Sequence, residues 1–212
     1  WREERQAPVR KELLTRGGCP KVQPAVSPDG RWIAYREDCA PGGVFLIPSQ
    51  PGHTGRLIAR FGKDPSFSPD GKALVYWIQD PQTRFGKAYV APLDREAEPL
   101  RIAREFDDAH GVVWSPDPGW ILVCGTRRGA NWPAEQHDFW LVPAPDAKER
   151  MVGEPRKLGV FPALSQMGLR PHPSVFSRAQ FAWIGRDLIF VNSDRKIPKS
   201  PVENSPPPKH KS

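Results

Sequence analysis

The stretch Ser27-Pro28-Asp29-Gly30, followed by Arg31-Trp32-Ile33-Ala34-Tyr35, returns with small changes further along the chain. The second copy is Ser68-Pro69-Asp70-Gly71 with Lys72-Ala73-Leu74-Val75-Tyr76 behind it. The third copy is altered to Ser115-Pro116-Asp117-Pro118, followed by Gly119-Trp120-Ile121-Leu122-Val123. A degenerate fourth copy is visible at Gly185-Arg186-Asp187-Leu188-Ile189-Phe190. A spacing of about 40–50 residues indicates an architecture in which each copy builds one structural unit.

Each copy has the residues of a tight β-hairpin. Proline suits the second position of a type I turn, and aspartate is tolerated at the third. A glycine just after the turn can adopt positive φ and form a bulge. In the third copy Pro118 replaces that glycine, so we expect the turn to shift and place Gly119 in the permissive conformation. Apolar residues precede each turn and β-branched or aromatic residues follow it, as in paired strands.

Two further strands are expected in each unit. The third ends in proline, at Val44–Pro48, Ala88–Pro92 and Phe139–Pro143, and the fourth covers Arg56–Arg60, Pro99–Arg104 and Pro155–Leu158. Proline fits only strand ends and edges, because it cannot donate to the ladder. Four short antiparallel strands in roughly 40–45 residues are typical of a propeller blade. We therefore predict an all-β fold: a partial β-propeller of three four-stranded blades and a degenerate fourth. The alternative is a generic sandwich, which leaves the joint recurrence of turn and proline unexplained.

The Ser-Pro-Asp-Gly-Arg/Lys turn with its aliphatic-aromatic strand resembles the WD40-like (PD40-type) repeat of the TolB propellers. Similar repeats build the propellers of prolyl-oligopeptidase-type enzymes and the sensor-like ends of some bacterial kinases and transcription factors. The resemblance covers about residues 9–191 and implies a bacterial propeller. It also implies a periplasmic or other extracytoplasmic location, with the cytoplasm as the alternative. The motif is specific for the repeat but indicates little about function.

The repeats divide the chain into three parts. Residues 1–8 form a polar leading segment, residues 9–194 the blades, and residues 195–212 a basic, proline-rich tail with a disordered composition. Val9–Thr15 is expected to be an outer strand, and Val160–Ser174 an irregular stretch between the third blade and the fourth. Since three blades and part of a fourth seldom close a ring, we expect more blades on the N-terminal side.

Composition excludes several classes of protein. The chain has 212 residues, a net charge of +7 and no apolar run long enough to span a membrane. The tail carries five Lys or Arg against one acid, which favours a solvated tail over a phosphate-binding or lipid-binding one. No nucleic-acid-binding module is recognisable, so nucleic acid is not expected as a partner. Nothing in the sequence indicates an oligomeric state.

The cysteines are Cys19, Cys39 and Cys124, too few and too scattered for a disulfide framework or a zinc site. A single Cys19–Cys39 bridge is one arrangement. We expect instead three buried or half-buried free thiols.

The sequence offers no catalytic motif. It has no Gly-x-Ser-x-Gly elbow and no phosphate-binding loop. Five isolated histidines show no metal-ligand spacing, so neither a metal site nor a cofactor is expected. The densest polar cluster is Asp107, Asp108 and His110, expected in a loop just before the innermost strand of blade three, at an end of the central channel. It could bind a cation such as calcium, but a solvated turn is the simpler interpretation.

A long connection, Thr126–Asp138, joins the second and third strands of blade three. Loops on rigid scaffolds often carry binding residues. Arg127, Arg128, Trp132 and His137 are therefore candidate binding residues, together with Asp107, Asp108 and His110. The alternative is that this loop merely covers a neighbouring blade, with Trp132 buried beneath it.

The sequence is compatible with two functions. The first is a non-catalytic binding module for a protein or peptide, such as the sensor part of a larger bacterial protein. The second is the propeller of a prolyl-oligopeptidase-type serine hydrolase whose catalytic domain lies outside this chain. We favour the first, because a polar, proline-rich tail follows the last repeat and resembles a true C-terminus.

Overall fold

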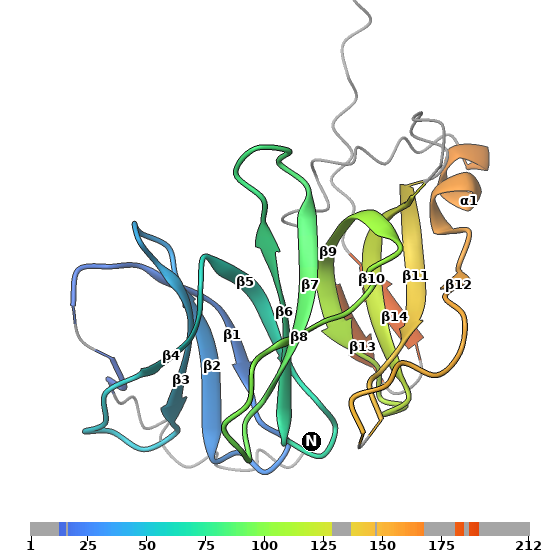
Figure 1. Cartoon of the computed structure of the whole chain (residues 1–212). Coiled ribbons are helices and arrows are strands. Elements are labelled where there is room, and N and C mark those ends of the chain that lie inside the picture. The colour runs from blue at the N-terminus through green and yellow to red at the C-terminus, as the bar shows by residue number, and fades with distance from the viewer. Residues whose placement is uncertain are drawn as a thin grey trace, which may run out of the picture.

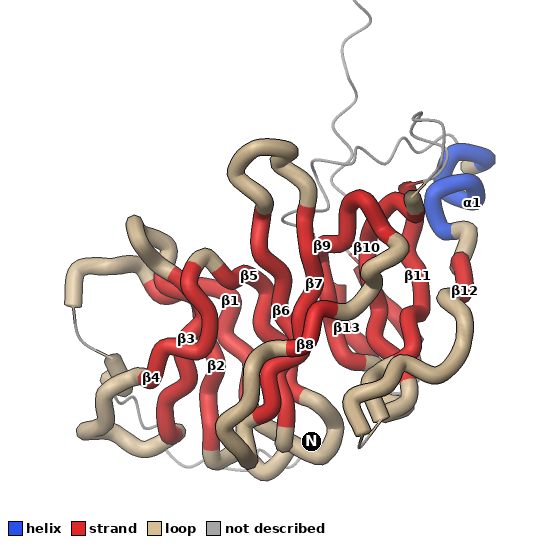
Figure 2. Tube along the Cα trace, in the orientation of Figure 1, coloured by secondary structure: helices blue, strands red, loops and turns tan. Residues whose placement is uncertain are grey.

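The computed structural model describes residues 13–15, 17–128, 137–146, 148–167, 181–184 and 187–190. Their strands form three four-stranded antiparallel sheets and one two-stranded sheet. The three larger sheets stand side by side in chain order, with the loops gathered at their two ends (Figures 1 and 2). The predicted all-β fold and partial propeller are confirmed, and each four-stranded sheet is one blade.

The blades repeat one topology, in which sequential strands are neighbours. Blade one contains β1 (Lys21–Val26), β2 (Trp32–Glu37), β3 (Gly43–Pro48) and β4 (Arg56–Arg60). Blade two contains β5 (Gly62–Phe67), β6 (Ala73–Gln79), β7 (Gly86–Pro92) and β8 (Leu100–Arg101). Blade three contains β9 (Phe106–Trp114), β10 (Trp120–Arg127), β11 (His137–Pro143) and β12 (Arg156–Lys157). The remaining pair is β13 (Phe181–Ile184) and β14 (Asp187–Phe190).

The core lies between the blades. Along β6, Leu74 and Tyr76 pack in the cluster shared with blade one. Val75 and Trp77 pack in the cluster shared with blade three. Successive side chains of a strand point to opposite faces. This central blade is therefore covered on both faces, which explains why β6 is apolar without alternation.

Every first strand carries the same bulge. Gln23, Asp64 and Gly111 all lie four residues before the serine of the turn, with φ of 53°, 50° and 52°. The pairing register of each first strand shifts at this place. Gln23 and Asp64 use the bulge to hydrogen-bond each other between blades one and two. Blade three has glycine here instead, so its inner strand carries no side chain at that position.

The hairpin turns of blades one and two match the prediction. Gly30 and Gly71 have φ of 71° and 72° and donate their amides to Ser27 and Ser68, each at 2.9 Å. In blade three the expectation for Gly119 is wrong, because Gly119 is not among the glycines with positive φ. The Trp120 amide bonds to the Asp117 carbonyl at 3.1 Å, so Pro118 now holds the first corner of the turn. Proline fixes φ near −65°, which suits that corner.

Three other expectations need correction. Leu13–Thr15, the described part of the expected outer strand, are not in a strand. The stretch expected to be irregular begins with helix α1 (Val160–Gln166), whose buried Phe161 packs edge-on against Phe139 of β11. Strands β10 and β11 extend into the predicted long connection, so its two ends are sheet rather than loop.

The prediction of three free thiols is also wrong. Cys19 and Cys39 form a disulfide, with Cα atoms 5.8 Å apart, and only Cys124 is a free, buried thiol. The bridge closes the open end of the first hairpin, where Lys21 pairs with Glu37.

The leading segment 1–8 and the tail 195–212 lie outside the described residues. Within the described ranges, no helix has the length and apolar character needed to cross a bilayer.

Candidate functional site

A buried polar cluster occupies one face of blade three, at the end away from the Ser-Pro-Asp turns. Strand register builds it in two rows. His110 of β9 pairs with Cys124 of β10, and in the next row Thr126 pairs with both Asp108 and His137. Paired positions on neighbouring strands present their side chains to the same face. We call Asp108, His110, Cys124, Thr126 and His137 the histidine–cysteine cluster.

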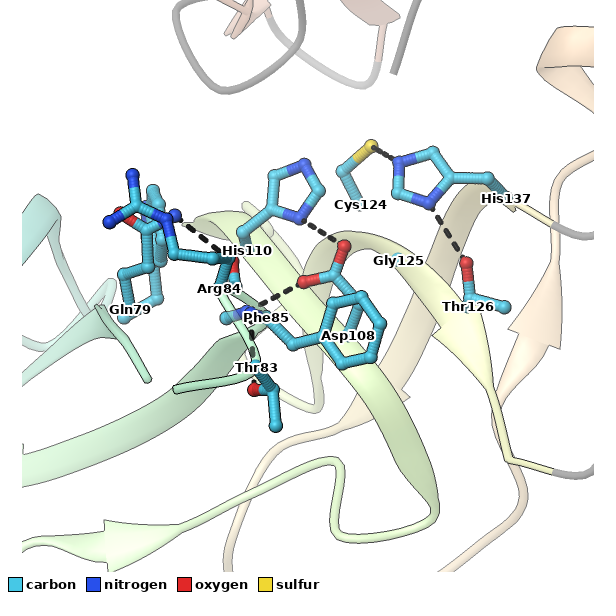
Figure 3. Close-up of polar contacts among 12 residues, drawn as sticks. Gln79, Thr83, Arg84, Phe85, Asp108, His110, Cys124, Gly125, Thr126 and His137 are labelled. Atoms are coloured by element: carbon cyan, nitrogen blue, oxygen red, sulfur yellow. Dashed lines mark hydrogen bonds and ion pairs between the residues drawn. The ribbon is translucent and has the colours of Figure 1, made fainter. Parts of the chain in front are cut away.

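The contacts within the cluster are specific. Asp108 Oδ2 lies 3.2 Å from His110 Nδ1, and its Oδ1 accepts the Gly86 amide at 2.6 Å. Thr126 Oγ1 lies 3.0 Å from His137 Nδ1, and Cys124 Sγ lies 3.4 Å from His137 Nε2. Figure 3 shows these contacts, with Cys124 placed between the two imidazoles. Each histidine is thus held through its Nδ1.

The histidines and the cysteine of the cluster are buried. Cys124 is 0% exposed, His137 3% and His110 6%. The two imidazoles stack at 5.2 Å between ring centroids, with Trp77 against His110 and Phe161 against His137. Among the described residues, His110 Nε2 has no hydrogen-bond partner. An orphaned buried nitrogen is unusual, because buried polar groups are nearly always paired.

Burial and the neighbouring polar groups determine the protonation states of His137, Cys124 and Asp108. Burial lowers the pKa of His137 to about 4, with a further contribution from the charge of His110. It raises the pKa of the Cys124 thiol, and the carboxylates of Asp108 and Asp138 add to that effect. Burial also acts to raise the pKa of Asp108, but the hydrogen bond and charge of His110 outweigh it and the net pKa is lowered. At neutral pH the cluster therefore contains a neutral His137, a thiol and an ionised Asp108.

Two glycines let the backbone approach this site. A Cβ on Gly125 would lie 2.1 Å from the Asp108 carbonyl oxygen. A Cβ on Gly86 would lie 2.6 Å from the Ala109 carbonyl oxygen. Real Cβ atoms cannot come so close, so glycine at both positions permits the tight packing around Asp108.

The candidates predicted from sequence separate into two groups. Asp108, His110 and His137 come together in the buried cluster. Asp108 and His110 lie in β9 and not in the expected channel-mouth loop, and His137 begins β11 and does not lie in the expected long connection. Asp107 instead forms an exposed ion pair with Arg128, with Nε and Oδ1 3.3 Å apart. The neighbouring carboxylates of Asp107 and Asp108 therefore have separate partners, which argues against the calcium interpretation. Arg127 pairs with Glu154 at 3.2 Å, and Trp132 lies outside the described residues.

Sequence reasoning missed Cys124 and Thr126. It treated the histidines as isolated, whereas the sheet places His110 and His137 next to each other. The pairing register of blade three reveals them only when the bulge at Gly111 is taken into account.

A groove of about 360 Å³ lies between blades two and three, at the end that holds the Ser-Pro-Asp turns. Apolar side chains, among them Val90, Leu100 and Trp114, form part of its lining. Five acidic residues and two basic ones supply its charge: Asp70, Asp94, Glu98, Asp146 and Glu149, with Lys72 and Arg95. An ion pair from Arg95 to Glu149, 2.5 Å long, joins the two blades here.

Solved structures with the same arrangement of blades are known. TolB from Acinetobacter baumannii superimposes with a TM-score of 0.50 and 22% identity, over 66% of this chain and 32% of that one. A putative TolB from Agrobacterium tumefaciens has the same score and identity, over 66% of this chain and 50% of its own. The β-propeller domain of the Trilobed protease from Pyrococcus furiosus gives 0.52 and 17%, over 86% and 51%.

These likenesses concern the fold. The chain spans about a third to a half of the structures it matches. No protein-family profile matches the sequence, and neither does any curated protein. The repeated turn, the four-stranded blades and the TolB structures agree on the architecture: the chain is a partial β-propeller whose blades are arranged as in the TolB structures.

Proposed function

We propose that this chain is a non-catalytic binding module, and that the groove between blades two and three docks a peptide or protein segment with basic side chains. The observation that carries the proposal is the groove itself. Its volume of about 360 Å³ is in the range of ligand pockets, and its lining combines apolar side chains with charged ones.

The charge of the groove favours a basic occupant. Acidic residues outnumber basic ones in the lining by five to two, although the whole chain has a net charge of +7. Glu149 pairs with Arg95 and Asp146 with Arg150, so the excess of acid comes from Asp70, Asp94 and Glu98 against Lys72. Complementary charge across an interface promotes correct encounter and disfavours wrong partners. The apolar part of the lining, with Trp114, would contact the aliphatic or aromatic side chains of the same segment. Tryptophan is enriched at binding hot spots.

We also propose an extracytoplasmic location. The Cys19–Cys39 disulfide supports it, because such bridges persist in oxidising compartments and are rare in the cytosol.

A matched pair of charge reversals tests the groove. Glu98 lines it, whereas Glu96, two residues earlier and also exposed, does not. The wild-type chain, Glu98→Lys and Glu96→Lys would each be applied to an array of peptides that vary in charge and in apolar content. We expect the wild type and Glu96→Lys to select the same basic peptides. Glu98→Lys should bind them about tenfold more weakly, since it places like charges opposite each other and a loss of about 1.4 kcal/mol is tenfold in affinity.

The outcome that contradicts the proposal is equally definite. Equal losses in the two variants would mean a general charge effect and not docking in the groove. Selection of acidic peptides, or of none, would remove the groove as the binding site.

A second candidate is the propeller of a serine hydrolase whose catalytic domain lies outside this chain. It is favoured by the likeness to the protease propeller, which aligns with 86% of this chain. The test uses the complete gene product and a fluorophosphonate probe, which labels an activated serine covalently. Labelling that heat denaturation abolishes would support this candidate, and absence of labelling would count against it.

A further inference from the structure

The histidine–cysteine cluster has a composition that a packed core does not require. We propose that His110, Cys124 and His137 form a three-ligand binding site for a transition-metal ion of the zinc class. The inference is independent of peptide docking, because the cluster lies at the opposite end of blade three from the groove.

The first argument is the placement of donor atoms. One nitrogen from each histidine and the sulfur of Cys124 lie within 4.8 Å of one another. Ligand atoms around tetrahedral zinc are about 3.5 Å apart, as follows from bond lengths of about 2.0–2.3 Å. Small side-chain rotations would close the difference. The three residues come from three adjacent strands, β9, β10 and β11, so the sheet already holds them together.

The second argument is orientation. Metal-binding histidines usually direct their other ring nitrogen to a carboxylate or another oxygen, which fixes the tautomer. Here Asp108 Oδ2 holds His110 Nδ1, and Thr126 Oγ1 holds His137 Nδ1. A carboxylate can only accept, so His110 carries a proton on Nδ1, and in the neutral form of the imidazole that binds metals its Nε2 presents a lone pair. Both Nε2 atoms are thereby left for another partner.

The third argument is the orphaned nitrogen. A hydrogen bond between Cys124 and His137 explains two of the three polar groups without any ion. It does not explain His110 Nε2, which is buried and has no partner among the described residues. A bound cation would satisfy this atom, which is why we prefer a metal site to a hydrogen-bonded core.

The fourth argument is charge. Neutral imidazole and thiolate are the forms that bind metals. A divalent ion would release the Cys124 thiol proton to solvent and leave one thiolate. Together with the carboxylate of Asp108 this thiolate balances the two positive charges, so the buried site carries no net charge.

The donor set also selects the ion. Two nitrogens and one sulfur suit zinc, cobalt or copper, whereas calcium and magnesium require oxygen ligands. The second group of potential ligands, Cys19, Glu37 and Cys39, is not comparable, because its cysteines are joined in a disulfide.

Cobalt provides a direct readout, because a bond between Co²⁺ and a thiolate gives a charge-transfer absorption band. The whole chain, treated with EDTA and dialysed without reductant, would be titrated with Co²⁺. We expect one equivalent to bind with a sulfur-to-cobalt charge-transfer band, and Zn²⁺ but not Ca²⁺ to displace it. The band should vanish in Cys124→Ser. His110→Gln and His137→Gln should bind at least tenfold more weakly, and Thr126→Val about 10–100-fold more weakly.

The matched control is His53→Gln, which changes an exposed histidine outside the cluster and should bind like the wild type. Absence of the charge-transfer band in the wild type, its persistence in Cys124→Ser, or an equal loss in His53→Gln would overturn the proposal.

A measurement on the wild type keeps the test valid if a variant does not fold. X-ray absorption of the zinc-loaded chain should show one sulfur and two imidazole nitrogens in the first shell. A shell without sulfur would reject the site.

Discussion

Glycine at position 71 is required by backbone conformation and not by space. Gly71 has φ of +72°, and a Cβ built on it would meet only Pro28 Cδ, at 3.6 Å, which is an ordinary contact. The cost of Gly71→Ala is therefore the cost of the left-handed region for an L-residue, about 1–2 kcal/mol. A smaller gain from a less flexible unfolded chain offsets part of it. We expect a net loss of about 1 kcal/mol.

Gly119 is the matched control. It occupies the corresponding hairpin of blade three without positive φ, and a Cβ there would lie 3.4 Å from Asp117 Oδ1. Gly119→Ala should therefore change the unfolding free energy by less than about 0.5 kcal/mol. Urea unfolding of both variants, followed by tryptophan fluorescence, measures the difference. Equal losses at the two positions, or a larger loss at Gly119, would refute the assignment of the two turn types.

Three further predictions concern acid stability, packing and a surface ion pair. Partial burial acts to raise the pKa of Asp70, but hydrogen bonds from the Ser68 hydroxyl and the Lys72 amide outweigh it and lower this pKa below its ordinary 3.8. The contribution of ionised Asp70 to folding stability is therefore present above pH 3.8 and is lost as the pH falls. Melting temperatures from about pH 5 to 3 should therefore decline less in Asp70→Asn than in the wild type, and an equal decline would contradict the role of Asp70. Gly125→Ala should lower the free energy of unfolding by about 1–3 kcal/mol or prevent folding, because its Cβ would lie 2.1 Å from the Asp108 carbonyl oxygen. Gly18→Ala, where no atom lies within 4 Å of the added Cβ, should leave the thermal melt unchanged. Arg128→Ala should lower stability by less than about 1 kcal/mol, since its ion pair with Asp107 is exposed; a larger loss in urea unfolding would mean that Arg128 supports the fold.

The repeat could be predicted from the sequence because its signals are local. Serine, proline, aspartate and glycine determine the turn through contacts within five residues, such as the Trp32 amide to Ser27 Oγ at 2.9 Å. The continuous apolar run of β6 follows from burial on both faces. Gly119 was misjudged because Pro118 moves the turn forward by two residues and removes the need for positive φ.

The disulfide could be approached from the sequence but not assigned. Counting outward from the Val26–Ile33 pair without a bulge would place Cys39 opposite Pro20, one residue from Cys19. The register shift between Val22 and Ala25 brings Lys21 opposite Glu37, and Cys19 and Cys39 lie two residues beyond that pair, close enough for a bridge.

The histidine–cysteine cluster depends on the corresponding register shift in blade three. Counting back from the Ile121–Trp114 pair without a bulge would place Cys124 opposite Gly111 and turn His110 to the other face. The bulge at Gly111 shifts the register by one residue and brings His110 opposite Cys124. This bulge can be recognised only by comparing the first strands of the three blades, because the residues at its position, Gln23, Asp64 and Gly111, share no side-chain chemistry.

The central claim, that the groove between blades two and three is the binding surface, is tested most directly by nuclear magnetic resonance. A peptide selected on the array would be titrated into the ¹⁵N-labelled chain. The account predicts saturable shifts that cluster on groove amides such as those of Asp94, Leu100 and Asp146, with the amides of Arg127 and Arg128 unmoved. Saturable shifts centred on Arg127 and Arg128, with the groove amides unmoved, would contradict it and place the binding surface at the other end of blade three.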